Sequence, residues 1–151
     1  MTEEQKRNAD EMLFDTQNVF GKGEPNTAYA RYFTGESFLC PLTKPQDGIA
    51  LANVTFSPGC RNDWHIHHAA TGGGQILLCT AGEGWHREDG KAAVKLVPGS
   101  VVVIPPNVRH WHGAAADKWF SHIAFEIPGT GCYTEWCEKV ADEEYRGVGE
   151  A

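Results

Sequence analysis

The pattern that most restricts the fold is a series of short apolar runs, each ended by a turn signal. From Tyr32 onward, stretches rich in Val, Ile, Leu and Phe alternate with Gly, Pro, Asn and Asp. "GIALANVTF" (48–56) ends at "SPG", and "DG" (89–90) separates "GWHRE" from "AAVKLV", which predicts a hairpin. At least eight such runs fit in the chain, and 17 glycines and 8 prolines supply turns. We therefore expect an all-β domain, either a sandwich or a barrel.

Composition narrows the class of protein further. A chain of 151 residues with 41% hydrophobic and 22% charged residues suits one ordinary globular domain. The net charge of −7 argues against nucleic acid or an anionic membrane as a partner, and no apolar run could span a bilayer. The start does not resemble a signal peptide. Five irregularly spaced cysteines without a C-x-x-C pair predict free thiols and a cytoplasmic location.

We expect three segments along the chain. Residues 1–31 form an N-terminal helix and arm, with Thr2 as the cap and Gln5 at the capping-box position. Residues 32–128 form the β-domain, and no linker divides them. Residues 129–151 form a helical tail, because "YTEWCEKVADEEY" carries apolar residues and a Glu–Lys pair at helical spacing.

Two pairs of histidines indicate a metal site. Side chains alternate between the faces of a strand, so His65 and His67 of "WHIH" point to one side. His110 and His112 of "RHWH" repeat the arrangement on another predicted strand. The apolar neighbours of these residues would make an unpaired buried imidazole costly, whereas coordination to a metal satisfies it.

The alternative interpretation of a histidine is a surface or hydrogen-bonded side chain. We assign His68 and His86 to this alternative. His122 shares a strand face with Phe120, Ala124 and Glu126, so we expect it to face the same cavity as the metal site. A core histidine bonded to a backbone carbonyl is the other possibility for His122.

Inward positions on the predicted strands outline a small apolar pocket that suits a small molecule, aromatic molecules included. The expected lining residues, by alternation, are Ala52, Val54, Phe56, Leu77 and Phe120. Trp64, Trp111 and Trp119 face the other way. Outward tryptophans on a barrel indicate either a covering helix or a subunit interface, and on this basis we predict a homo-oligomer, most simply a dimer.

The histidine-bearing segments resemble the two motifs of the cupin superfamily over residues 32–128. The first motif, G-x5-H-x-H-x3-4-E-x6-G, matches at Gly59, His65, His67, Gln75 and Gly82. The second, G-x5-P-x-G-x2-H-x3-N, matches at Gly99, Pro105, Asn107 and His110. Asparagine suits the left-handed turn where the motif has glycine, and Ala114 replaces the final asparagine. The resemblance implies a single-domain jelly-roll β-barrel.

The departures from the motif concern the metal ligands. Gln75 stands where the family has a glutamate, and "HAATGGG" makes its distance from His67 longer than the pattern allows. The resemblance implies one divalent transition metal ion (Mn, Fe, Zn, Ni or Co) held by His65, His67, Gln75 and His110. Because all four ligands would be neutral, the ion would keep its full charge and act as a stronger Lewis acid.

Within the cupins, the sequence is most similar to the hydroxynitrile lyases of cupin type and to the carboxymuconolactone decarboxylase-associated cupins. The similar segments are "YFTG", "VTFSPG", "WHIH", "AGEGW", "PPNVRHWHGA", "SHIAFE" and "EWCEKVADEEY". This likeness implies a lyase of hydroxynitrile or aldol type, with His122 as general base and His112 as its partner or a second proton carrier. Asn62 stands where the lyases have threonine and Glu126 where they have glutamine, so both are expected beside the substrate.

Two other functions are compatible with the same residues. A cupin dioxygenase or isomerase would use Fe or Mn at this site, and a metal-dependent binding cupin would hold a small molecule without turnover. No helix-turn-helix or second domain is evident in the sequence, which counts against a regulator.

Overall fold

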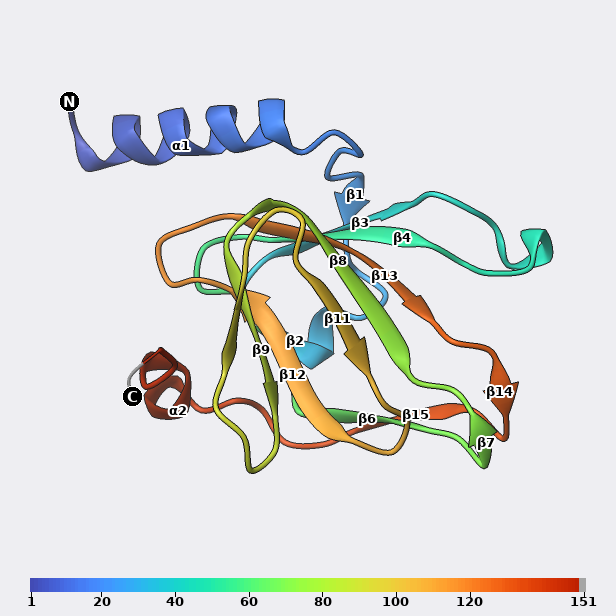
Figure 1. Ribbon diagram of the computed structural model, residues 1–151. Coiled ribbons are helices and arrows are strands. Elements are labelled where there is room, and N and C mark those ends of the chain that lie inside the picture. The colour runs from blue at the N-terminus through green and yellow to red at the C-terminus, as the bar shows by residue number, and fades with distance from the viewer. Residues whose placement is uncertain (150–151) are drawn as a thin grey trace.

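The computed structural model describes residues 1–149, and two antiparallel β-sheets form its body (Figure 1). The first sheet has the order β1 (Glu24–Pro25), β3 (Ser37–Pro41), β4 (Ala52–Phe56), β13 (Phe120–Glu126), β8 (Gln75–Gly82) and β11 (Val101–Ile104). The second has the order β10 (Val94–Leu96), β9 (Gly84–Glu88), β12 (Arg109–Ala114), β5 (Arg61–Asn62) and β2 (Phe33–Thr34), and β6 (His65–His68) joins β12 to β15 (Tyr133–Trp136). Short elements complete the described chain: the ladder of β7 (Thr71–Gly72) with β14 (Gly129–Thr130), and the 3-10 turns Ala30–Tyr32 and Pro45–Asp47. The all-β prediction is confirmed.

The predicted turn residues occur where the backbone needs them. Gly90, in the hairpin between β9 and β10, has a φ of +78°, which glycine adopts without strain. Asn107 has a φ of +67° and is the one non-glycine residue with positive φ among residues 1–149. Its side-chain amide accepts from the Ala69 N–H and donates to the Ala69 carbonyl. The asparagine therefore supplies both the left-handed turn and an anchor for the longer loop after His67.

The apolar core lies between the two sheets. Its fully buried members include Phe56 from β4, Phe120 from β13 and Leu96 from β10. Phe56 and Phe120 are cross-strand neighbours, and their ring centroids lie 5.5 Å apart. These rings fill the end of the barrel, so the histidines occupy the remaining interior.

The N-terminal helix is capped as predicted. Helix α1 (Glu3–Gln17) has a complete capping box between Thr2 and Gln5. Of its fifteen residues only Phe14 is buried, with its ring 5.7 Å from that of Trp119. Neither α1 nor any other helix in residues 1–149 combines the length and apolar character of a membrane-spanning helix.

The C-terminal segment differs from the predicted helix over its first part. Tyr133–Trp136 is strand β15, which pairs with β6 so that Trp136 lies opposite His65. The open edge of β6 offers backbone hydrogen bonds to this segment, and this pairing overrides its helical spacing. The predicted C-terminal helix is present as α2 (Asp142–Arg146), and residues 150–151 of the expected tail lie outside the described residues.

The outward tryptophans are covered by the chain's own helices. Trp64 and Trp111 are buried in a cluster with Val140 and with Tyr145 of α2. The Tyr145 hydroxyl donates to the Ala114 carbonyl at 2.5 Å, which holds α2 against the barrel. Trp119 packs against α1 instead. A helix cover therefore accounts for all three residues, and the homo-oligomer stays a prediction that needs another surface.

Candidate metal centre

Three imidazoles converge inside the barrel. His65 and His67 lie on β6, and His110 lies on the adjacent strand β12, directly opposite His65. One ring nitrogen from each lies within 4.8 Å of the others, close enough for all three to bind a single ion. The alternation predicted from "HIH" and "RHWH" therefore places these rings on the inner face.

The far side of each ring is held by a hydrogen-bond acceptor. The Nδ1 of His65 lies 2.8 Å from the Asp63 carbonyl, and that of His110 lies 2.9 Å from the Val108 carbonyl. When Nδ1 carries the proton and donates it to the carbonyl, the Nε2 lone pair is left for a ligand. The Nε2 atoms of His67 and His110 are buried without a hydrogen-bond partner. These orphaned nitrogens are what a bound transition metal would satisfy.

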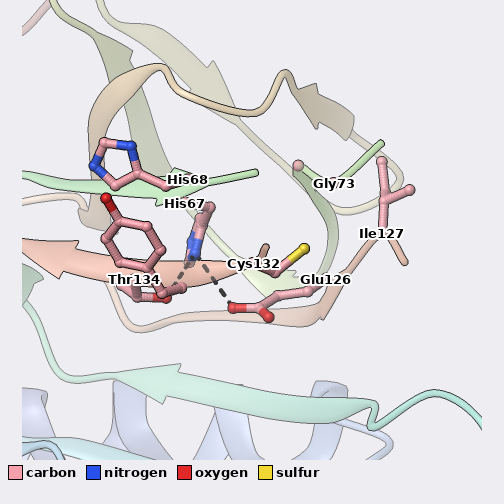
Figure 2. A pocket seen from close by; sticks show the side chains of 9 residues that line it. His67, His68, Gly73, Glu126, Ile127, Cys132 and Thr134 are labelled. Atoms are coloured by element: carbon pink, nitrogen blue, oxygen red, sulfur yellow. Dashed lines mark hydrogen bonds and ion pairs between the residues drawn. The ribbon is translucent and has the colours of Figure 1, made fainter. Parts of the chain in front are cut away.

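The third imidazole has a different partner. His67 Nδ1 lies 3.1 Å from the Thr134 hydroxyl and 3.2 Å from a carboxylate oxygen of Glu126 (Figure 2). The hydrogen bond with His67 is the main cause that lowers the pKa of Glu126. Glu126 thus lies at the rim of the candidate site, in contact with His67.

Gln75 completes a candidate ligand set in spite of the longer loop before it. The additional residues form the end of β6 and the short strand β7, which pairs with β14, and Gln75 still begins β8. Its Oε1 atom is buried without a partner. Gly74, just before Gln75, lets the backbone pass close to β11, because a Cβ at this position would lie 2.5 Å from the Ile104 carbonyl oxygen. Gln75 as a ligand remains a prediction, and its orphaned oxygen is compatible with it.

Burial favours the neutral form of His65 and His110. Loss of hydration lowers the pKa of His110 to about 3 and that of His65 well below its usual value. Positive charge on the neighbouring imidazoles would lower both pKa values further. A neutral imidazole has the free lone pair that a metal requires, so these two residues can bind an ion without losing a proton.

A second pair of histidines lies beside the triad. His122 Nε2 and His112 Nδ1 share a hydrogen bond of 3.0 Å, and both residues are buried. The Asn62 side-chain oxygen accepts from the His112 backbone N–H at 2.9 Å, and its amide nitrogen lies 3.2 Å from His112 Nε2. Burial lowers the pKa of His122 to about 3 and holds that of His112 well below its usual value. Both rings are therefore neutral at pH 7.

The predicted pocket residues lie on the inner faces around His122. Val54 is its cross-strand neighbour, and Ala52 and Leu77 flank Ala124. Val54 and Ala52 are half-buried, whereas Phe56 and Phe120 are fully buried members of the core. A small hollow of about 10 Å³ opens at the rim, and its lining includes His67, Glu126 and Cys132 (Figure 2).

Three residues near the triad were not predicted. His86, assigned above to the surface or a hydrogen bond, is 4% exposed, and its ring lies 5.9 Å from that of His110. Alternation with Gly84 and Glu88 could have indicated this inward direction. Thr134 and Trp136 reach the site on β15, and the Trp136 ring lies 4.7 Å from that of His65. They were missed because the segment was interpreted as helix. His68, by contrast, pairs with Glu135 at 2.7 Å, as its assignment required.

Comparison with known proteins places the chain in a family. A family model described as a cupin domain matches residues 52–123. The sequence is 41% identical over 119 residues to the (R)-mandelonitrile lyase of Granulicella tundricola. The aligned region covers 78% of this chain and 88% of the relative. The chain belongs to the cupin family. The predicted resemblance to the cupins and their hydroxynitrile lyases is thereby confirmed.

Two solved structures have a similar fold. A cupin-like protein of Thermotoga maritima is 39% identical, with a TM-score of 0.75 over 88% of this cupin and 98% of that chain. A DMSP lyase of Ruegeria pomeroyi is 16% identical, with a TM-score of 0.56 over 78% of this cupin and 57% of that chain. The second likeness concerns the fold alone.

Proposed function

We propose that this cupin is a metal-dependent carbon–carbon lyase that cleaves cyanohydrins of the mandelonitrile type to an aldehyde and hydrogen cyanide. The observation that carries the proposal is the proximity of two sets of imidazoles. His65, His67 and His110 converge on one point, while His122 and His112 form a separate neutral pair beside them. The relative named (R)-mandelonitrile lyase supports this choice of substrate class.

The residues that would hold the metal are His65, His67, His110 and Gln75. Their donor set fits a divalent transition ion, because nitrogen and oxygen atoms in this interior are buried without partners. When bound, such an ion supplies Lewis acidity towards an oxygen of the substrate. We propose Mn, Fe, Zn, Ni or Co as the ion.

His122 is the proposed general base. Its Nδ1 is buried without a partner, so it can accept the hydroxyl proton of the substrate while Nε2–H donates to His112 Nδ1. A base with a pKa near 3 is weak, but the hydrogen bond with His112 lets the positive charge that His122 gains be shared with a second imidazole. Asn62 positions His112 through its backbone contact.

The bond changes are balanced without an oxidant or reductant. As the hydroxyl proton moves to His122, the carbonyl double bond forms and the carbon–carbon electron pair leaves with cyanide. Cyanide then takes the proton from His122, and both products depart. Ala52 and Val54 leave room beside His122 for the organic group, with Leu77 on the neighbouring strand. Phe56 and Phe120 close the inner end of this space, and Glu126 lies at its rim.

We further propose that the protein acts in the cytoplasm on a small molecule, without nucleic acid or membrane partners, and as a homo-oligomer. The net charge of −7 and the five unpaired cysteines support the first two statements.

The test is mandelonitrile cleavage by metal-loaded protein, with the metal content measured in every sample. His122→Ala is expected to lose at least about 100-fold in kcat at unchanged metal content, because general-base catalysis contributes about 10² to 10⁴. His68→Ala is the control, since His68 pairs with Glu135 and is not one of the three converging imidazoles. Full activity in His122→Ala, or no cleavage by the loaded parent, would refute the proposal. Oxygen consumption with a phenolic substrate would favour a dioxygenase instead.

A further inference from the structure

His65 is supported by two segments that lie far from it in the sequence. Its Nδ1 atom lies 2.8 Å from the Asp63 carbonyl, and the Asp63 backbone N–H donates to the Tyr32 carbonyl at 2.8 Å. The Lys139 ammonium donates to the Arg31 carbonyl at 3.1 Å and lies 3.4 Å from the Asp63 carboxylate. The residue that orients this imidazole is therefore anchored both to the 3-10 turn before β2 and to the segment that follows β15.

Two aromatic rings from the same segments pack in series against the His65 imidazole. Trp136 on β15 lies directly opposite His65 on the neighbouring strand β6 (Figure 1), so the two side chains share a face of the sheet. Their ring centroids lie 4.7 Å apart, with the ring planes inclined by 32°. The Tyr32 ring stacks on Trp136 in turn, at 4.3 Å and with the planes only 4° apart. Trp136 therefore contacts both a candidate metal ligand and the half-buried Tyr32.

The other two candidate histidine ligands have different neighbours. Among residues 1–149, the aromatic rings next to those of His67 and His110 are all imidazoles. A hydrogen bond at Nδ1 fixes one edge of an imidazole, but the ring can still tilt about that bond and carry Nε2 with it. A flat ring packed against the imidazole opposes this tilt. The contact with Trp136 therefore gives His65 a restraint that the hydrogen bond to Asp63 cannot supply.

We propose that Trp136, backed by Tyr32, is a positioning residue of the metal centre. It holds the plane of the His65 ring so that its coordinating nitrogen stays within reach of those of His67 and His110. This inference rests on the metal site of the proposed function but not on its reaction. Because linked equilibria are reciprocal, an ion that binds more tightly when Trp136 is in place must also hold β15 against β6.

The test measures the affinity of the full chain for Co²⁺ by competition with a chelator, in the absence of any substrate. Trp136→Leu removes the packed ring and is expected to weaken Co²⁺ binding about 10-fold, at the low end for partners of a metal ligand. It should also shift the visible absorption of the bound Co²⁺, which depends on the geometry of its ligands. Trp136→Phe restores a flat ring, so it should recover most of the affinity and the spectrum of the parent.

Tyr133→Leu is the matched control, because it removes a ring of the same strand that is stacked on a histidine of β6. Tyr133 lies opposite His68, with the ring centroids 4.6 Å apart and the planes 17° apart. Side chains alternate along a strand, so this pair lies on the opposite face from Trp136 and His65. His68 is not one of the three converging imidazoles. Tyr133→Leu should therefore leave both the Co²⁺ affinity and the spectrum unchanged.

Amide hydrogen exchange measures the reciprocal effect in the same proteins. The Cys137 N–H, next to Trp136, donates to the Trp64 carbonyl at 2.7 Å and reports whether this segment is docked. Saturating Co²⁺ should slow its exchange more in the parent than in Trp136→Leu, by about the same 10-fold factor as the difference in affinity. Equal slowing in the two proteins would contradict the proposal.

Circular dichroism establishes that each variant is folded. If Trp136→Leu does not fold, Tyr32→Leu decides, because it removes the ring behind Trp136, leaves β15 unchanged and should still weaken Co²⁺ binding. The proposal is overturned by the parent's affinity in the deciding variant, by an equal loss in Tyr133→Leu, or by a Trp136→Phe protein that binds no better than Trp136→Leu. A parent that binds no Co²⁺ would overturn it together with the metal centre, whereas a parent that binds Co²⁺ without cleaving mandelonitrile would refute the reaction alone.

Discussion

At the scale of single residues, the candidate site depends on which nitrogen of each imidazole is already engaged. His65 and His110 are oriented by backbone carbonyls, whose positions the strands hold rigidly. His67 instead relies on the side chains of Glu126 and Thr134. Side-chain partners can be replaced by mutation without disturbing the backbone. His67 is therefore the candidate ligand at which the effect of the hydrogen bond to Nδ1 on metal binding can be tested.

Removing the charge at Glu126 should weaken metal binding. In Glu126→Gln the amide no longer offers an anionic acceptor to His67 Nδ1, so the ring is less basic and less well oriented. We expect metal affinity to fall by about 10-fold, at the low end for outer contacts because Glu126 is 59% exposed. Competition with a chelator measures the change. Glu135→Gln, which alters the equivalent pair with His68, should have no effect, and equal losses in both would contradict the assignment.

His122 should make stability depend on pH. Its pKa is lowered to about 3 in the folded protein, and an unfolded histidine titrates near 6.5. Between these values the unfolded state binds more protons, so the stabilisation is complete above about pH 6.5 and is lost as the pH falls. The free energy of unfolding of the metal-free protein should fall by about 1.4 kcal/mol per pH unit from this residue.

Urea unfolding between about pH 7.5 and pH 5.5, above the range where carboxylates titrate, measures this slope. His122→Gln, which cannot take up the proton, should have a smaller slope. An identical slope in the variant would show that His122 is not held neutral by the fold.

At the scale of elements, the positions of the candidate ligands depend on the strands that pair with β6 and on the backbone that leads into β8. The pairing of β6 with β12 sets His65 opposite His110, and β15 then adds Thr134 to the same face. Gln75 reaches the interior because Gly73 lets the chain pass close to Ala69 and Gly74 lets it pass close to the end of β11. Both glycines have positive φ, at +81° and +104°.

Gly74→Ala should disturb both stability and metal binding. The new Cβ would meet the Ile104 carbonyl at 2.5 Å, and the φ of +104° is strained for alanine. We expect a loss of about 3 kcal/mol or more in the free energy of unfolding and weaker metal binding as Gln75 shifts. Gly48→Ala separates the two causes, since Gly48 has a φ of +110° but open space around it. It should cost about 1 to 2 kcal/mol and leave metal binding unchanged. Equal effects at both positions would contradict the close-contact explanation.

At the scale of the whole molecule, the barrel is closed around polar groups that a bound ion would satisfy. The C-terminal segment stabilises the second sheet in two ways. Strand β15 extends the sheet by pairing with β6, and α2 covers Trp64 and Trp111 on the outer face. Arg61 strengthens this closure by donating to the Val140 carbonyl and to Asp142. A ligand that binds only the closed barrel must stabilise the entire fold.

Metal removal should therefore lower the melting temperature. At a free metal concentration 100 times the Kd, binding adds about 2.7 kcal/mol to the free energy of unfolding. Calorimetry with and without a chelator should show a fall of several degrees in Tm. The difference should disappear in His67→Ala and persist in His68→Ala, whose side chain lies outside the site. An unchanged Tm in the parent would count against a metal centre.

Turn signals and the alternation of residues along each strand predicted an all-β sandwich or barrel, the inward direction of the paired histidines and His122, and the outward direction of the tryptophans, whereas the choice of a barrel came from the resemblance to the cupins. This information is local, because a strand's side-chain period does not depend on its neighbours. The strand at Tyr133–Trp136 and the place of Gln75 after a longer loop required the folded chain. Each depends on an edge or a cross-strand partner that lies far away in the sequence, and pairing of that kind leaves no mark within the segment itself.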